Sequence, residues 1–119
     1  MAIHILLLED VRTDAELIEH ELRQAGLDFV SRHVTTQTDF VRELRDFQPD
    51  VVLSDHNVPQ FDGRAALRLV GQMSPHVPFI LVTGSLSEET AVEYMKSGAA
   101  DYVLKDRLAR LGSAVVGAL

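Results

Sequence analysis

Short, almost wholly apolar runs constrain the fold of this chain most strongly. They are Ile3–Leu8, which only His4 interrupts, Val51–Leu53 and Phe79–Val82. Apolar runs of this length suit strands buried on both faces, as in parallel sheets covered by helices on both sides. The segments 29–34 and 100–104 complete a set of five predicted strands, and the weaker pattern of 29–34 places it nearer an edge.

Amphipathic segments lie between these runs and predict helices. The expected helices cover 12–25 and 36–47, a third begins at Asp62-Gly63, a fourth ends at Gly98, and a fifth follows Asp106. Ser85 with Glu88 forms a capping pattern at the start of the fourth, which would pack through Ala91, Val92 and Met95. Asp106 is the expected cap of the last helix. Alternating strands and helices imply a parallel sheet with right-handed crossovers.

Size and composition exclude several classes of protein. We predict that the 119 residues, 1–119, form one domain. The net charge of -7 and the absence of a basic stripe argue against direct nucleic-acid binding. No apolar run approaches the roughly 20 residues that cross a bilayer. The chain has no cysteine, which excludes disulfides and thiolate metal sites and fits a cytoplasmic location.

Polar residues follow the predicted strands where the apolar runs stop. Glu9-Asp10 follows the first strand, Asp55 the third, Thr83-Gly84 the fourth and Lys105 the fifth. Ligands of open α/β sheets bind outside the carboxyl ends of the strands, so these residues are candidates for one site. Lysine occurs only twice against nine arginines, which makes Lys105 a more specific choice than usual.

The predicted cluster suits phosphoryl transfer. Two carboxylates about 4 Å apart repel by about 4 kcal/mol at an effective dielectric of 20, so Glu9, Asp10 and Asp55 should hold a proton or a cation. Oxygen-only ligands favour Mg²⁺, which also neutralises phosphate. Asp55 could act as the nucleophile, since carboxylates form acyl phosphates. Lys105 and the Thr83 hydroxyl could contact phosphoryl oxygens.

Taken together, these motifs resemble the receiver domain of two-component response regulators. The resemblance rests on the strand-end residues, on Val58-Pro59 with Asp62-Gly63, and on the segment 98–102. It implies a flavodoxin-like (βα)5 three-layer α/β sandwich with a five-stranded parallel sheet in the order 2-1-3-4-5. It also implies that Asp55 takes a phosphoryl group from a phosphohistidine of a sensor histidine kinase or a histidine phosphotransfer protein.

The resemblance also implies roles for individual residues. Mg²⁺ would be held by Glu9, Asp10, Asp55 and the backbone carbonyl of Asn57, while Thr83 and Tyr102 would form a switch pair that changes the face of helix four, strand five and helix five. Asn57 and Ser85 would tune the lifetime of the phosphorylated state. Phosphorylation could drive formation of a homodimer. Such a protein assists its own phosphorylation and slow dephosphorylation but is not a turnover enzyme.

One position departs from the family pattern. Proline usually follows the lysine, often after a cis bond, whereas this chain has Lys105-Asp106. A cis bond without proline costs roughly 3 kcal/mol, so we expect a trans bond and a different loop.

Other interpretations stay open. An aspartyl-phosphate hydrolase would need a second acid where this chain has Asn57, and a receiver that only docks would not need the full acid set. The chain could stand alone or be one module of a hybrid kinase or multi-domain regulator. The five histidines show no metal-binding spacing and are expected to be structural or surface residues; they are His4, His20, His33, His56 and His76. Packing or partner binding could explain Leu86, Tyr94, Met95 and Tyr102.

Overall fold

The computed structural model describes residues 2–84 and 87–119, and its centre is a five-stranded parallel sheet in the order β2-β1-β3-β4-β5. The predicted flavodoxin-like order is therefore confirmed. The strands are β1 (Ile3–Leu8), β2 (Phe29–Val34), β3 (Val51–Ser54), β4 (Phe79–Thr83) and β5 (Asp101–Leu104). The helices are α1 (Arg12–Gln24), α2 (Gln37–Asp46), α3 (Gly63–Met73), α4 (Glu88–Lys96), the 3₁₀ segment η1 (Lys105–Arg110) and α5 (Leu111–Ala118).

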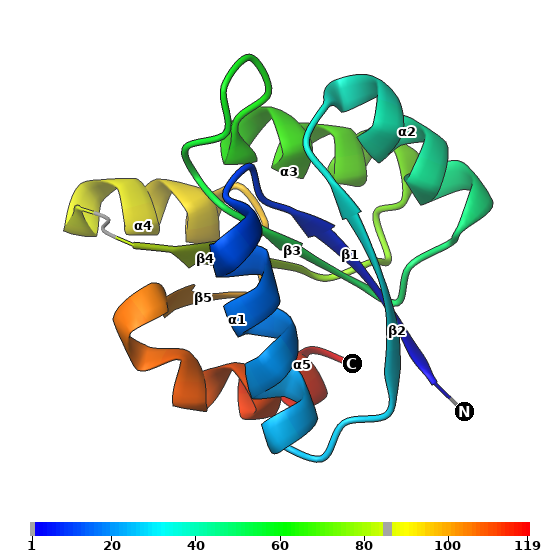
Figure 1. Ribbon diagram of the computed structural model, residues 1–119. Coiled ribbons are helices and arrows are strands. Elements are labelled where there is room, and N and C mark those ends of the chain that lie inside the picture. The colour runs from blue at the N-terminus through cyan, green and yellow to red at the C-terminus, as the bar shows by residue number, and fades with distance from the viewer. Residues whose placement is uncertain (1, 85–86) are drawn as a thin grey trace.

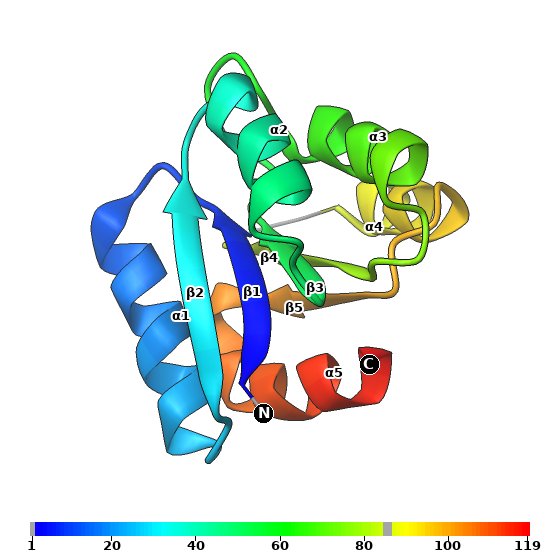
Figure 2. The ribbon, with the colours of Figure 1, turned by 90° about the vertical axis from the view of Figure 1, so that its right-hand side faces the viewer.

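Helices cover both faces of the sheet. Figures 1 and 2 show α2, α3 and α4 on one side and α1 with α5 on the other. Alternate residues of one strand feed the two cores: Leu6 and Leu8 pack under α2 and α3, whereas Ile5 and Leu7 pack under α1 and α5. This double burial explains why the central strands are apolar throughout.

Capping residues fix several helix ends where the sequence indicated them. The side chains of Thr36 and Asp62 accept hydrogen bonds from backbone N–H groups in the first turns of α2 and α3. Gly26 and Gly98 end α1 and α4 with φ of 81° and 110°, a conformation that side chains with a Cβ rarely adopt.

The predicted inward face of α4 is confirmed at Ala91 but was wrong at its other two residues. Val92 and Met95 are 46% and 42% exposed, while Ala91 and Tyr94 are buried. The apolar pattern allowed either face, and the large ring of Tyr94 buries more area than the other choice. Ser87 caps α4 by accepting from the Thr90 N–H. The expected cap, Ser85, and also Leu86, lie outside the described residues.

The segment after β5 also differs from the expectation. The Lys105–Asp106 bond is trans, as predicted. Asp106 does not cap the last helix, because a 3₁₀ turn comes first and Arg107 leaves helical geometry at φ -134°. The Arg110 guanidinium holds this turn against β5 through two bonds to the Asp101 carboxylate, at 3.0 and 3.1 Å. No helix in the residues described is both long and apolar enough to cross a membrane.

Candidate functional site

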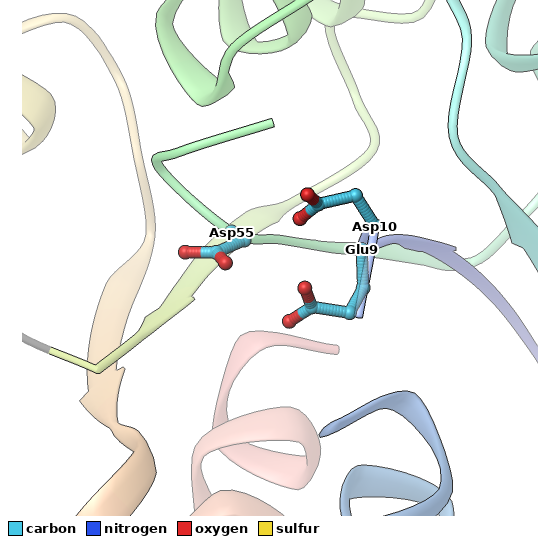
Figure 3. A group of neighbouring side chains, drawn as sticks. All are labelled: Glu9, Asp10 and Asp55. Atoms are coloured by element: carbon cyan, nitrogen blue, oxygen red, sulfur yellow. The ribbon is translucent and has the colours of Figure 1, made fainter. Parts of the chain in front are cut away.

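Three carboxylates converge where β1 and β3 end side by side. Glu9 and Asp10 follow β1, Asp55 follows β3, and each offers an oxygen within 4.8 Å of the other two (Figure 3). The Asp55 N–H donates to the Leu8 carbonyl at 2.9 Å, which extends the ladder between the two strands past their ends. The pairing of β1 with β3 therefore sets the spacing of the acids. This agrees with the prediction that residues after neighbouring parallel strands meet at one edge of the sheet.

The three acids differ in burial. Glu9 is fully buried and Asp55 is 7% exposed, whereas Asp10 lies open to solvent. Burial raises the pKa of Glu9 above its ordinary value, because contacts with Lys105 and the Val11 N–H only partly offset the loss of water. The cluster thus has a buried floor and an open side.

Lys105 compensates the negative charge of the cluster. Its Nζ lies 2.5 Å from Glu9 Oε1, 2.8 Å from Asp14 Oδ2 and 3.0 Å from Asp55 Oδ2. An ammonium has three donors, so these three carboxylates match its capacity. Burial alone would lower the pKa of Lys105, but the three acids raise it well above its ordinary value. The lysine is therefore charged across the physiological range.

The sequence analysis missed Asp14. It lies in the first turn of α1, directly after the acid pair, and reaches Lys105 across 91 positions of the chain. An acid in the first turn of a helix is usually explained by its favourable interaction with the helix dipole, so this position by itself offered no reason to expect a contact between Asp14 and Lys105. The first turn of α1 directly follows β1 and Glu9-Asp10, so an acid there could have been predicted to lie at the same sheet edge as Glu9.

Asp55 is held as an ion. Burial alone would raise its pKa, but Lys105, the Thr83 hydroxyl and the His56 N–H together lower it. The His56 N–H donates to Oδ1 at 2.7 Å and Lys105 donates to Oδ2 at 3.0 Å. A carboxylate with both oxygens held by donors is ionised and oriented, as a nucleophile requires.

The donor set fits Mg²⁺. Glu9 Oε1 is buried and contacts Lys105 Nζ at 2.5 Å, and it has no other donor among the described residues. A carboxylate oxygen has two lone pairs, so this atom could bind a metal ion in addition to Lys105. Oxygens bound to one Mg²⁺ at about 2.1 Å lie at most about 4.2 Å apart, so small rotations of Glu9, Asp10 and Asp55 would bring them into range.

Thr83, Tyr102 and Asn57 are the other predicted site residues that the structure describes. Thr83 is 1% exposed at the end of β4, and Tyr102 is 39% exposed on β5. Tyr102 pairs with Leu81, two residues before Thr83, so both switch candidates project from the same face of the sheet. Asn57 is exposed in the loop after β3, and Ser85 falls outside the described residues.

The histidines are structural or exposed, as predicted, but two of them reach the site. The His56 ring contacts the Tyr94 hydroxyl, and His33 Nε2 contacts the backbone carbonyl of Glu9. His4 stacks on Phe47 with a centroid distance of 4.6 Å. The His56 ring binds the Tyr94 hydroxyl, which agrees with the prediction that it does not bind the Asp55 carboxylate, but the sequence could not reveal the bond made by the His56 backbone.

A family model described as the response regulator receiver domain matches residues 5–115. The chain belongs to this family. Response regulator protein FleR of Pseudomonas aeruginosa is 36% identical to this receiver domain over 110 residues, which are 92% of the chain and 23% of FleR. Transcriptional regulatory protein ZraR of Escherichia coli is 31% identical over 87% of the chain and 23% of ZraR. The chain thus spans about a quarter of the curated relatives it matches.

Solved structures show the same fold. The chemotaxis protein CheY4 of Vibrio cholerae superposes with a TM-score of 0.87 at 20% identity, over 100% of both chains. The receiver domain of a signal transduction histidine kinase from Syntrophus aciditrophicus superposes with a TM-score of 0.83 at 31% identity, over 99% of this chain and 90% of that one. The receiver therefore has the family's fold over its full described length.

Proposed function

We propose that this receiver domain is a phosphorylation-controlled signalling module in which Asp55 accepts a phosphoryl group. The observation that carries the proposal is the oriented Asp55 carboxylate, held between the His56 N–H and Lys105 beside two further acids. The donor would be a phosphohistidine of a sensor histidine kinase or a histidine phosphotransfer protein. Residues 1–119 would form one such module.

In the proposed step an Asp55 oxygen attacks phosphorus. The new P–O bond forms as the P–N bond breaks, and the electron pair of that bond returns to the imidazole nitrogen of the donor. Lys105 and the Thr83 hydroxyl would pair with phosphoryl oxygens, so that placement and charge do most of the catalysis. Mg²⁺ held by Glu9, Asp10, Asp55 and the Asn57 carbonyl would offset repulsion between the phosphoryl group and the acids.

The proposed output is a change in the α4–β5–α5 face. Thr83 would move toward the phosphoryl group and Tyr102 would turn inward into the space this opens. The ring of Tyr102 is 39% exposed and would gain free energy by burial, which supports this step. The same face could then bind a second copy, which sedimentation with and without beryllofluoride would detect.

We also propose that the module does not turn over substrate. Asn57 stands where an aspartyl-phosphate hydrolase would need its second acid, and Asn57 with Ser85 would instead set the lifetime of the phosphorylated state. A cytoplasmic location remains our prediction from the sequence.

Acetyl phosphate and Mg²⁺, followed by intact-mass measurement, test the proposal. The wild type should gain the mass of one phosphoryl group, and Asp55→Asn should gain none. Asp46→Asn, which removes an exposed carboxylate on α2, is the matched control and should behave as wild type. Equal labelling of wild type and Asp55→Asn would contradict the proposal.

A further inference from the structure

A hydrogen bond links α4 to the residue that follows Asp55. His56 Nδ1 and the Tyr94 hydroxyl lie 2.6 Å apart, and their rings meet edge to face at 5.5 Å. Tyr94 is only 1% exposed, and a buried phenol in an apolar core normally requires a polar partner. His56 is that partner, 38 positions away in the chain.

The surrounding packing holds this pair in one arrangement. The Tyr94 ring lies nearly parallel to Phe79 of β4, with 15° between the planes. At Gly63, the first residue of α3, a Cβ would lie 2.6 Å from the Tyr94 hydroxyl and 2.7 Å from the Asp55 carbonyl oxygen. Glycine at this position leaves the space that the hydroxyl occupies. The ends of β3, α3 and α4 therefore meet around one phenol oxygen.

The backbone of His56 contacts the Asp55 carboxylate, the proposed phosphoryl acceptor. Its backbone N–H donates to Asp55 Oδ1 at 2.7 Å, while its ring holds Tyr94. A hydrogen bond to a carboxylate is roughly twice as strong as one to a neutral oxygen. When the carboxylate becomes an acyl phosphate its charge moves outward onto the phosphoryl group, so the bond that holds the His56 backbone weakens.

We propose that Tyr94 is a positioning residue that couples α4 to the state of Asp55 through His56, in parallel with the Thr83–Tyr102 pair. The proposal rests on the phosphorylation of Asp55 proposed above. A shift of His56 would move the Tyr94 hydroxyl as well, because the two groups are hydrogen-bonded and the close packing around the hydroxyl offers it no other position. Since Tyr94 is the main buried anchor of α4, the helix would follow.

Tyr94→Phe tests this coupling, because it removes the hydroxyl and keeps the ring on Phe79. Beryllofluoride with Mg²⁺ serves as the phosphoryl mimic: fluorine NMR reports its occupancy, and amide spectra report the response of residues 88–96. Thr38→Ala, which removes an exposed hydroxyl on α2, is the control.

Beryllofluoride should shift the α4 amides and the His56 ring nitrogen in wild type and in Thr38→Ala. In Tyr94→Phe, bound beryllofluoride should still appear and the Thr83 amide should still shift, but the α4 response should fall by about half or more, as expected when one of two parallel connections is cut. The affinity for beryllofluoride should drop by no more than about fivefold, the effect of one hydrogen bond.

An unchanged α4 response in Tyr94→Phe with beryllofluoride bound would overturn the coupling and leave the phosphorylation proposal intact. Absence of bound beryllofluoride on the wild type would contradict the proposed function, and the coupling with it. If Tyr94→Phe does not fold, His56→Phe removes the same bond from the less buried partner, and the same α4 readout decides.

Discussion

The acid-lined edge at the ends of β1 and β3 and the face made by α4, β5 and α5 are built in opposite ways. At the first, fully buried Glu9 and nearly buried Asp55 both contact the Lys105 ammonium, so each of these two carboxylates has a partner of opposite charge. At the second, apolar groups are left in water: Met95 is 42% exposed and Val116 is 56% exposed.

This difference indicates which part of the molecule can change conformation at a low cost in free energy. Moving a buried charge away from its partner costs several kcal/mol, whereas an exposed apolar side chain gains free energy when it becomes covered. The edge is thus suited to hold a rigid reactive group, and the face is suited to alter its shape or bind a partner. The experiments below test this difference between the acid-lined edge and the α4–β5–α5 face, in order of decreasing effect.

Lys105→Met should cause the largest loss. It leaves three carboxylates without their shared cation, and removing one partner of a buried ion pair costs about 3–5 kcal/mol, here reduced toward about 2–3 by the partial exposure of Lys105. Urea unfolding measures the change. Lys96→Met, at the only other lysine, which is exposed on α4, should stay within about 0.5 kcal/mol.

Mg²⁺ should restore part of the stability that Lys105→Met loses, because a cation bound only by the folded state stabilises it. Equal stabilities of Lys105→Met and Lys96→Met would contradict the claim that Lys105 stabilises the acid-lined edge more than an exposed lysine stabilises α4.

Gly63→Ala should be the next largest effect. The new Cβ would meet the Asp55 backbone oxygen at 2.7 Å, which cannot give way as a flexible side chain could, so we expect a loss of about 1–3 kcal/mol. Gly71→Ala is the control on the same helix. Its Cβ would meet no described atom within 4 Å, and alanine should stabilise that site by about 0.5–1 kcal/mol. Thermal or urea unfolding of both variants decides; equal effects would contradict crowding at Gly63.

The two buried acids should respond to pH with opposite signs. Burial raises the pKa of Glu9, so the folded state holds its proton more tightly and the stability of the wild type relative to Glu9→Gln should fall as pH rises from about 4.5. The pKa of Asp55 is lowered despite burial, mainly by Lys105. The stability of the wild type relative to Asp55→Asn should therefore be present above about pH 3.8 and be lost as pH falls below it.

Urea unfolding between about pH 3 and 7, without Mg²⁺, measures both differences. Parallel pH profiles for the two variants would show that Glu9 and Asp55 do not occupy the distinct environments described above.

Arg110→Ala should have the smallest effect, since it removes an exposed pair. The pair with Asp101 should contribute about 0.2–1 kcal/mol. Burial alone would raise the pKa of Asp101, but Arg110 lowers it, so this contribution should be present above the ordinary carboxyl pKa of 3.8 and vanish as pH falls through it. A loss above about 2 kcal/mol would show that the turn after β5 is as rigid as the acid-lined edge.

Much of the acid-lined edge could be predicted from the sequence. The apolar runs gave the strands, and the residue after each run gave Glu9, Asp10, Asp55, Thr83 and Lys105, because the carboxyl ends of parallel strands lie at one edge. Capping residues and glycines likewise marked most helix ends. These inferences succeed since they depend on local pattern and on a topology with few alternatives.

What the sequence could not decide depends on how helices rotate and on contacts between distant positions. The face that α4 turns inward, the contact of Asp14 with Lys105 and the bond between His56 and Tyr94 all join elements that the local pattern treats separately. Local pattern and topology were enough to predict which groups meet at the sheet edge. Which hydrogen-bond partner each buried polar group has depends on the folded packing, because such a group pairs with whatever donor or acceptor the packing brings within reach.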